Sequence, residues 1–588
     1  MKQFFKFFFA SVLGVIAGSI LLFFILIGIL SVIANSFGSE TAAPLKTAHI
    51  LEIKLNDEIK ERTSKNPFQN LDPVTLKSSS QPGLYDIITG IDKAASDENI
   101  KGIYLHNTSL NGGLASIEEI RNALLRFKSS GKFIISYADA YDQGAYYLAT
   151  VADTLFLHPQ GLIDLRGYLA ELMFFRGTLD KLEIEPQLIR HGKFKSAAES
   201  FTEFKMSPEN KLQWKEMLDG FWVHAKSNLA SSRNLNAEAI QQIADSAAGL
   251  NPKTALASGL ADRLVFEDEV LDILKRETGK KETEEPALIS IGKYYKIPPK
   301  DLKYVKNRIA VIFATGGIDV GEGDDEKIGS ETTAAAIRKA RLDEKIKAIV
   351  FRVNSGGGSA LASDVIWREI KLTREKKPVV VSMGDVAASG GYYISCASDS
   401  IFCMPNTITG SIGVIGLIMN FENFLKNKLG ITMDGYKTAH LANLGYANHK
   451  MTDTERRVLQ NLIEFIYDDF TKKVADGRKM EQHEVDSIGQ GRVWSGIDAA
   501  RIGLIDKQGG LYEAIECAKR MAGLSEYKIT QLPEQKDPFQ EMLESMKTEA
   551  SLFFSGFSKE EKEYIKLLKR YVPSSGAQTV LPVKFEIH

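Results

Sequence analysis

Cysteine is scarce in this chain, and neither sign of charge dominates. Only three of the 588 residues are cysteines, Cys396, Cys403 and Cys517. So few cysteines exclude a disulfide framework and a cysteine-based metal knuckle. The 73 Lys and Arg residues balance 75 Asp and Glu residues, which gives a formal net charge of −2. This balance does not suggest a nucleic-acid partner, and we expect neither a nucleic acid nor a metal as a ligand.

Charge is missing altogether from one segment near the N-terminus. Residues 7–39 contain no Asp, Glu, Lys or Arg. A membrane-spanning helix needs about 20 apolar residues, whereas the core of a signal peptide has about 7–15. We therefore predict an uncleaved anchor, with a cleaved signal peptide as the alternative. Lys2 and Lys6 precede the segment and the next basic residue is Lys46, so the N-terminus is expected in the cytoplasm. The rest would lie in the periplasm, anchored by a single pass through a bacterial inner membrane.

Two distant segments of the chain resemble each other. QGAYYLATVADTLFLHP, from Gln143 to Pro159, aligns without a gap with SGGYYISCASDSIFCMP, from Ser389 to Pro405. Upstream, ENIKGIYLHN parallels EKIKAIVFRVN, and downstream FKMSPENK parallels HKMTDTER at nearly the same offset. Matches in the same order over about 200 residues indicate a duplicated domain.

The duplication divides the chain into five parts. The stretch between the copies is charged and then contains prolines, which is typical of a linker, and the end of the chain is rich in Glu and Lys. The predicted parts are residues 1–46 (cytoplasmic N-terminus and transmembrane anchor), 47–275 (first repeat), 276–304 (linker), 305–530 (second repeat) and 531–588 (C-terminal tail).

Within the second copy, short β-branched and apolar runs alternate with segments of helical length. The runs IAVIFA, IKAIVFRV, PVVVSM and SIFCM are typical of strands. The segments SETTAAAIRKARLDE, SALASDVIWREIKLTRE and GYYISCAS are typical of the helices between them. This alternation predicts an α/β fold with a largely parallel sheet.

The two copies differ in a complementary way at two polar positions. Where the second copy has Ser389, the first has Gln143, and where the first copy has Lys195, the second has His440. One copy has kept a serine and the other a lysine. This pattern indicates one active site assembled from both copies, with Ser389 as nucleophile and Lys195 as general base. His440 is the alternative base, and a helix N-cap is the ordinary role of such a serine.

A lysine can activate a serine only while its amine is neutral. A serine hydroxyl is a weak nucleophile and needs an adjacent base. Burial, or a nearby positive charge, lowers the pKa of a lysine enough for that role. The small residues Ser-Ala-Ala that follow Lys195 allow close packing around the amine. Lys193 would lower the pKa of that amine further, and Glu199 would raise it if it faced the amine.

Acyl transfer also needs hydrogen-bond donors for the oxyanion, which are usually backbone N–H groups. Two places can supply them: the glycine-rich residues 354–364, NSGGGSALASD, and the N–H of Gly390 directly after Ser389. No Gly-Lys-Ser/Thr follows this turn, so it is not a phosphate-binding P-loop. Ser389 is not in a G-x-S-x-G elbow either, because position 387 is Ala387.

These residues resemble the signal peptide peptidase A family, also called protease IV, in its long, duplicated form. The resemblance covers nearly the whole chain. The matching features are the N-terminal anchor, FKSAAESF-x-x-FKMSPEN, RVNSGGGS, ASGGYY, TGSIGVIG and GRVWSGIDAARIGLID. The family often has proline where this chain has Gly356.

The resemblance implies tandem ClpP/crotonase-like domains, built from repeated ββα units, after an N-terminal transmembrane helix. It implies a Ser/Lys dyad with Ser389 as nucleophile and Lys195 as base. The implied oxyanion donors are the N–H groups of Gly358 and Gly390, and the hydroxyl of Ser411 would orient the lysine amine. The sequence contains no metal cluster or nucleotide-binding loop, so no cofactor is expected. Its implied substrates are peptides, notably signal peptides left in the membrane, and its implied assembly is a membrane-bound homotetramer.

Two other functions are weighed against this serine endopeptidase. A crotonase-like enzyme would use the same backbone donors on acyl-CoA thioesters, but CoA is cytosolic and the chain is expected in the periplasm. A catalytically inactive membrane scaffold would have lost both catalytic positions, whereas each survives in one copy.

Overall fold

The structure is a computed structural model that describes residues 45, 47–65, 81–298, 305–535 and 578–580, with scattered positions between 6 and 21. Most of both predicted repeats is therefore described. The predicted anchor at residues 7–39 lies largely outside the described residues. Within the described ranges, no helix is both long and apolar enough to cross a membrane.

The first repeat forms a parallel six-stranded sheet with the order β6-β4-β3-β2-β1-β7. Its strands are β1 (His49–Ile53), β2 (Ile100–Leu105), β3 (Phe133–Tyr141), β4 (Thr154–Ile163), β6 (Arg263–Leu264) and β7 (Leu288–Ser290). The helices of this part of the chain are α2 (Leu84–Ser96), α3 (Leu114–Lys128), α4 (Gln143–Ala149), α5 (Arg176–Leu182), α6 (Glu199–Thr202), α7 (Pro208–Arg233), α8 (Ala237–Ser246), α9 (Pro252–Ala257), α10 (Glu267–Glu277) and α11 (Ile291–Tyr294). β7 and α11 fall in the segment predicted as a linker, so part of that segment completes the first sheet.

The second repeat forms the same kind of sheet with the order β17-β15-β13-β11-β8-β19, extended by β14 and β18. Its strands are β8 (Arg308–Thr315), β11 (Ile346–Ser355), β13 (Val379–Ala388), β14 (Ser400–Cys403), β15 (Ile408–Gly410), β17 (Val493–Ser495), β18 (Lys507–Gln508) and β19 (Lys528–Leu532). Its helices are α12 (Ser330–Leu342), α13 (Ala360–Arg374), α14 (Gly390–Ser395), α15 (Asp453–Arg478), α16 (Gln482–Ile488), α17 (Gly496–Arg501) and α18 (Leu511–Met521). Only the pairing of β15 with β17 is antiparallel among the strand pairs described for this sheet. The predicted α/β fold with largely parallel sheets is confirmed.

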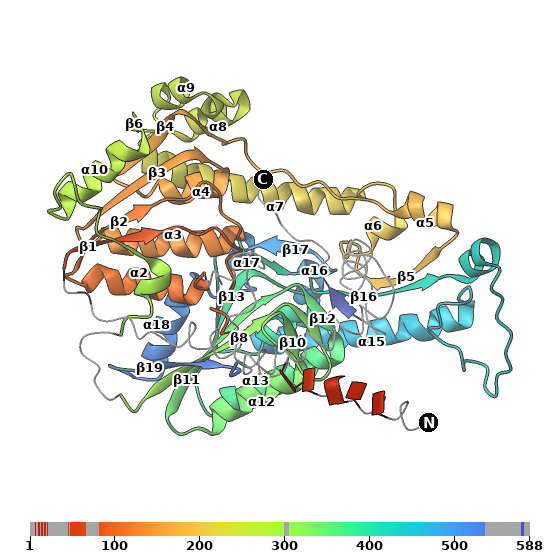
Figure 1. Cartoon of the computed structure of the whole chain (residues 1–588). Coiled ribbons are helices and arrows are strands. Elements are labelled where there is room, and N and C mark those ends of the chain that lie inside the picture. Colours follow the sequence, from red (N-terminus) through yellow and green to blue (C-terminus); the bar gives the residue numbers. More distant parts are fainter. Residues whose placement is uncertain are drawn as a thin grey trace.

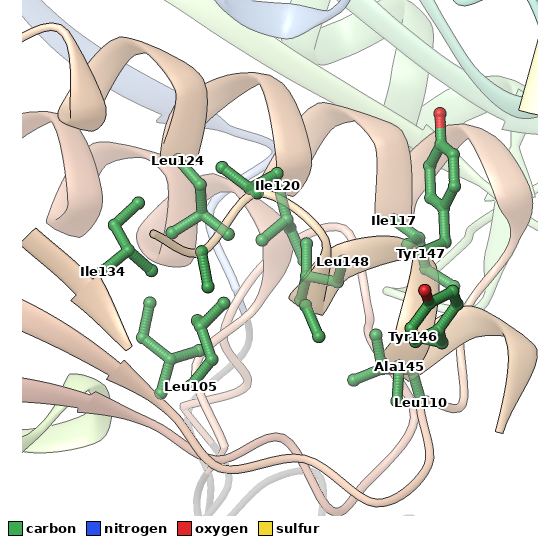
Figure 2. Close-up of a cluster of buried hydrophobic side chains, with 14 of the residues drawn as sticks. Leu105, Leu110, Ile117, Ile120, Leu124, Ile134, Ala145, Tyr146, Tyr147 and Leu148 are labelled. Carbon is green, nitrogen blue, oxygen red and sulfur yellow. The ribbon is translucent and has the colours of Figure 1, made fainter. Parts of the chain in front are cut away.

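Apolar periodicity explains why these segments form these elements. Nearly every residue of β11 is buried, as expected for a parallel strand covered on both faces. Ile117, Ile120 and Leu124 recur at helical spacing along α3 and are fully or almost fully buried. Figure 2 shows them grouped with Leu148 of α4 and Ile134 of β3. Burial of each such side chain contributes roughly 1.5–3 kcal/mol.

A third, smaller sheet joins the two repeats, with the order β10-β9-β12-β20-β16-β5. Its strands are β5 (Glu185–His191), β9 (Gly317–Asp319), β10 (Lys327–Gly329), β12 (Gly357–Ser359), β16 (Val414–Asn420) and β20 (Gln578–Val580). β5 comes from the first repeat and pairs antiparallel with β16 of the second along its whole length. Figure 1 shows this pair at one end of the molecule, beside α15.

The two repeats also pack directly on each other through a buried ionic cluster. Helices α2 and α3 of the first repeat lie between the two large sheets (Figure 1). Arg352 of β11 is fully buried and contacts Glu61 at 2.7 Å and Glu119 of α3 at 2.7 Å. Its guanidinium also donates to Ser382 Oγ at 2.9 Å and to the carbonyl oxygen of Met383 at 3.2 Å. Burial raises the pKa of Glu119 to about 7 against the opposing effect of Arg352.

Removal of the cation from this cluster is expected to destabilise the protein severely. Arg352→Met should lower the free energy of unfolding by about 3–5 kcal/mol, because two carboxylates would stay buried without their partner. The loss in the free energy of unfolding should be larger above pH 7 than near pH 5, because protonation of Glu119, whose pKa is about 7, removes its buried charge. Unfolding in guanidinium chloride, followed by circular dichroism at both pH values, measures the change in the free energy of unfolding.

The matched control is Lys215→Ala, which removes an exposed i,i+4 ion pair with Asp219 (2.7 Å). Such pairs contribute little, so its unfolding midpoint should not move measurably. An Arg352→Met variant as stable as the parent protein at both pH values would contradict the prediction.

Candidate active site

The pairing of β5 with β16 carries a loop of the first repeat into the second. The register runs from Glu185 opposite Asn420 to His191 opposite Val414. Lys195 follows the end of β5 by four residues, and Ser411 precedes the start of β16 by three. The cross-repeat strand pair therefore fixes where the lysine loop meets the second repeat.

Ser389 occupies a sharp turn between β13 and α14. It has φ 57° and ψ −116°, which is an unfavourable backbone conformation for a residue with a side chain. Its N–H donates to the carbonyl oxygen of Gly410 at 2.8 Å, which ties the turn to β15. The hydroxyl makes no capping bond to α14, although Ser389 stands at the N-cap position. The side chain is thus free to face another part of the molecule.

The amine of Lys195 lies against this hydroxyl. Lys195 Nζ is 2.7 Å from Ser389 Oγ, and it also donates to Ser411 Oγ at 2.9 Å and to the Ser411 carbonyl oxygen at 3.1 Å. All three residues are at most 1% exposed. The three sequence candidates Ser389, Lys195 and Ser411 therefore meet in one chain.

Burial lowers the pKa of the Lys195 amine to about 7. Its hydrogen-bond acceptors are a carbonyl and two hydroxyls, which carry no formal charge. The amine is therefore close to half neutral at neutral pH and can accept a proton. Lys193, which was considered as a source of positive charge, is exposed and lies 5.9 Å from the centre of the Phe194 ring.

Close backbone packing holds the lysine loop in place. The N–H of Phe194 donates to the carbonyl oxygen of Gln490 at 3.0 Å. The N–H of Gly491 donates to the carbonyl oxygen of Ile412 at 2.7 Å. A Cβ atom on Gly491 would lie 2.5 Å from Cβ of Lys195, and the φ of Gly491 is +78°. Only glycine fits both the contact and the conformation.

Glu199 supports the same loop and does not contact the amine. Its buried carboxylate accepts hydrogen bonds from Ser207 Oγ at 2.6 Å and from Asn210 Nδ2 at 2.8 Å. A weaker contact to Arg190 measures 4.0 Å. The negative charge therefore interacts with residues at the start of α7 and not with the Lys195 amine. For this reason it does not counteract the effect of burial on the pKa of Lys195.

Gly358 and Gly390, the two candidate donors for the oxyanion, lie in segments that contact each other. Gly390 is the first residue of α14, and a Cβ on the next residue, Gly391, would lie 2.6 Å from the carbonyl oxygen of Ser355. Gly358 follows in β12 with φ +158°, and a Cβ there would lie 2.0 Å from the carbonyl oxygen of Ile318. The N–H of Gly357 donates to Ser355 Oγ at 3.1 Å. This bond fixes the turn at the point where the family often has proline.

The corresponding place in the first repeat is closed. Gln143 replaces the serine, and its side-chain oxygen accepts from the N–H of Gly167 at 2.9 Å. Asp385 of the second repeat accepts from the N–H of Ser116 at 2.9 Å and from its hydroxyl at 2.6 Å. A Cβ on Gly113, the counterpart of Gly358, would lie 2.0 Å from the Asp385 carboxyl carbon. A carboxylate thus fills the position that corresponds to the candidate oxyanion site.

His440, the alternative base, does not join these side chains. It lies in an exposed loop before α15, whereas Ser389 is fully buried. Within the described ranges, no group of three or more His, Cys, Asp or Glu residues could hold a metal ion.

Sequence reasoning missed Asp385, Gly491 and the part played by Arg352. Asp385 stands only four residues before Ser389, but nothing in GDVAAS shows that it reaches the first repeat. Gly491 begins a motif that the resemblance had singled out, although its contact with Lys195 joins residues 296 positions apart. Each of these roles depends on a contact between distant parts of the chain.

Comparison with known proteins agrees with the duplication. The sequence model of peptidase family S49 matches twice, at residues 126–281 and 371–525, which together make up more than half of the chain. "Protease 4" of Haemophilus influenzae is 38% identical over 448 residues, which are 74% of this chain and 72% of that protein. "Serine protease SPPA, chloroplastic" of Arabidopsis thaliana is 34% identical over 472 residues, which are 79% of this chain and 69% of that protein.

One solved structure, that of a ClpP1 mutant from Listeria monocytogenes, matches at 14% identity over 35% of this chain and 94% of that chain. Its TM-score of 0.23 is too low to bear on the fold, so the ClpP/crotonase-like architecture stays a prediction. The chain belongs to peptidase family S49, with two tandem S49 domains, and is a serine protease that hydrolyses peptide bonds.

Proposed function

We propose that the protein is a membrane-anchored endopeptidase whose nucleophile is Ser389 and whose general base is Lys195. The observation that carries this proposal is the 2.7 Å separation of Lys195 Nζ and Ser389 Oγ in a fully buried setting. Nucleophilic catalysis by serine requires a base at this distance. A lysine with a pKa of about 7 can be that base near neutral pH.

In the first half of the reaction, Lys195 takes the proton from Ser389 as its oxygen attacks the carbonyl carbon of the substrate. The tetrahedral intermediate collapses when the C–N bond breaks, and the Lys195 ammonium returns the proton to the leaving amine. In the second half, Lys195 takes a proton from water, which attacks the acyl-enzyme. The ester bond then breaks to release the new carboxyl group, and the Lys195 ammonium returns its proton to Ser389 Oγ, which restores the hydroxyl and the neutral amine.

Two further sets of groups would support these steps. The N–H groups of Gly358 and Gly390 would donate to the oxyanion, since their segments adjoin beside Ser389. Ser411 would orient the amine through the 2.9 Å bond to its hydroxyl and the 3.1 Å bond to its carbonyl oxygen. Both acceptors also stabilise the ammonium that forms when the lysine takes a proton.

The proposed substrates are peptides such as cleaved signal peptides, as the family resemblance implies. The uncharged residues 7–39, preceded by Lys2 and Lys6, support a single-pass anchor in the inner membrane with both repeats in the periplasm. A homotetramer is proposed on the same resemblance. Membership of a peptidase family disfavours the acyl-CoA alternative, and the contact between Ser389 and Lys195 disfavours an inactive scaffold.

Loss of either member of the dyad should abolish activity. Ser389→Ala and Lys195→Ala are each expected to lower kcat for a fluorogenic apolar peptide by about 10⁴-fold or more, and the double variant should lose no more than either single one. The matched control is Lys193→Ala, two residues away and exposed, which should keep the parent's activity. Full activity in Ser389→Ala would rule out this serine as the nucleophile.

The pH profile should report the titration of Lys195. Because only the neutral amine accepts a proton, kcat/KM is expected to rise with pH to a plateau, with a midpoint near the pKa of about 7. Below that pH the amine is protonated, and kcat/KM should fall about tenfold per pH unit. Initial rates at substrate concentrations well below KM measure the profile. A profile that is flat between pH 5 and pH 8 would exclude a base with this pKa.

The anchor can be tested separately from the chemistry. The full chain, expressed in a Gram-negative bacterium, should sediment with membranes and be digested by protease added to spheroplasts. The chain without residues 1–46 should lose membrane attachment. A full chain that is protected in intact spheroplasts and digested only after lysis would place the repeats in the cytoplasm and contradict the proposal.

A further inference from the structure

One buried side chain of α7 holds the loop that carries Lys195. Gln213 is 3% exposed and points its amide at residues 192–198, the lysine loop. Its Nε2 donates to Ser196 Oγ at 2.8 Å and to the carbonyl oxygen of Phe194 at 3.4 Å. Phe194 and Ser196 are the two chain neighbours of Lys195. The Gln213 amide therefore supports the loop on both sides of the proposed base.

The oxygen of the same amide reaches the second repeat. Gln213 Oε1 accepts from the N–H of Val493 at 3.3 Å. Val493 lies opposite Gly410 in the pairing of β17 with β15. The carbonyl oxygen of Gly410 in turn accepts from the N–H of Ser389 at 2.8 Å. A short series of contacts thus joins Gln213 to the turn that carries the proposed nucleophile.

The network around this amide fixes which way it points. Nε2 also donates to Asn210 Oδ1 at 3.1 Å, and Asn210 Nδ2 donates to Glu199 at 2.8 Å. A glutamine amide has two N–H donors and one acceptor oxygen, and oxygens surround its nitrogen while an N–H faces its oxygen. A buried polar network with all its members satisfied is rigid. An apolar side chain in place of Gln213 would take a partner from both repeats at once.

The backbone contacts within the lysine loop are long or local. The N–H of Lys195 donates to the carbonyl oxygen of Gly192 at 3.4 Å, and the N–H of Ser196 donates to that of Phe194 at 2.8 Å. The guanidinium of Arg190 lies 3.5 Å from the carbonyl oxygen of Lys195. These bonds do not tie the loop to α7, whereas the Gln213 amide does.

The ionisable groups on the elements around the loop are engaged with other partners. They are Arg190 and His191 of β5, Lys193 of the loop, Glu199 of α6, Glu216 of α7, Tyr467 of α15, Asp486 of α16 and Arg492 before β17. Arg190 contacts Glu199, Arg492 contacts Glu216, His191 contacts Glu464, Tyr467 donates to Asp486, and Lys193 lies over the Phe194 ring. Burial alone lowers the pKa of Lys195 to about 7, so a change in that pKa would report a change in burial.

We propose that Gln213 is a positioning residue, which keeps the Lys195 amine buried and within hydrogen-bond distance of Ser389. This inference rests on the proposed function, which assigns the role of base to Lys195. Gln213 acts through Phe194, Ser196 and Val493 and not through contact with the substrate. Its loss should therefore change the chemical step and the titration of the amine, while substrate binding stays nearly the same.

The main test is Gln213→Met, because methionine keeps the length of the side chain and removes the amide. For a fluorogenic apolar peptide, kcat should fall about tenfold or more, since a small displacement of a catalytic group is costly, whereas KM should change less than about twofold. The midpoint of the profile of kcat/KM against pH should rise by about one pH unit, because water that enters a loosened loop stabilises the ammonium. Gln242→Met, the same change at an exposed position of α8, is the matched control and should leave all three quantities unchanged.

A second variant removes only the closest partner of the amide nitrogen. Ser196→Ala should raise the midpoint in the same direction and by less than Gln213→Met does. The double variant should raise it no further than Gln213→Met alone, because both changes remove the same interaction. Circular dichroism shows whether each chain is folded. Should Gln213→Met fail to fold, Ser196→Ala alone decides the question.

An unchanged midpoint in both single variants would overturn the proposal. A lower kcat with an unchanged midpoint would overturn it as well, because Gln213 would then support the fold without controlling the burial of the amine. Shifts that add in the double variant would also contradict it. Failure of the proposed function is distinguishable, because the parent protein would then lack a midpoint near pH 7 or Lys195→Ala would stay active.

Discussion

The fully buried guanidinium of Arg352 is the contact on which the arrangement of the two repeats depends. It lies on β11 of the second repeat and holds Glu61 and Glu119 of the first, each at 2.7 Å. A buried cation between two carboxylates tolerates little displacement, because each lost contact leaves a charge without a partner in a medium of low polarity. The cluster therefore fixes α3 against the second sheet. Asn354, which follows on β11, also donates to Glu61 at 2.8 Å, so the cluster extends to the start of the glycine-rich turn.

This docking brings residues of both repeats together in the proposed site. A lysine base must be buried to be neutral, and the burial of Lys195 is provided by groups of the other repeat, notably Ser411 and Gly491. In the first repeat, Asp385 of the second repeat fills the corresponding position at Gly113. Each repeat thus contributes one residue to the proposed site, and Gly113 of the first repeat lies at the interface with the second.

The small third sheet brings the groups of this site together. β5 and β16 bring the lysine loop to Ser389, and β12 carries the glycine turn to the other side of the same region. Between β12 and β16 lies β20, which pairs antiparallel with both.

Local patterns in the sequence determined much of this protein. Alternating apolar runs predicted β8, β11, β13 and β14 and the helices between them, because strand and helix periodicity depend on neighbouring residues. The duplication predicted that Ser389 and Lys195 work together, because a comparison of two copies reveals which polar residue each has lost. The motifs also identified Ser411 and the two glycines as candidates.

Only the tertiary structure decided the remaining features. It placed β7 of the predicted linker in the first sheet, set Asp385 against Gly113 and placed β20 between β12 and β16. It also showed that Glu199 is committed to Ser207 and that burial alone lowers the pKa of Lys195. These contacts join segments that are distant in the chain, and their distances follow from how whole elements pack. The sequence by itself determined which residues could act together, and the packing of the two repeats decided how they meet.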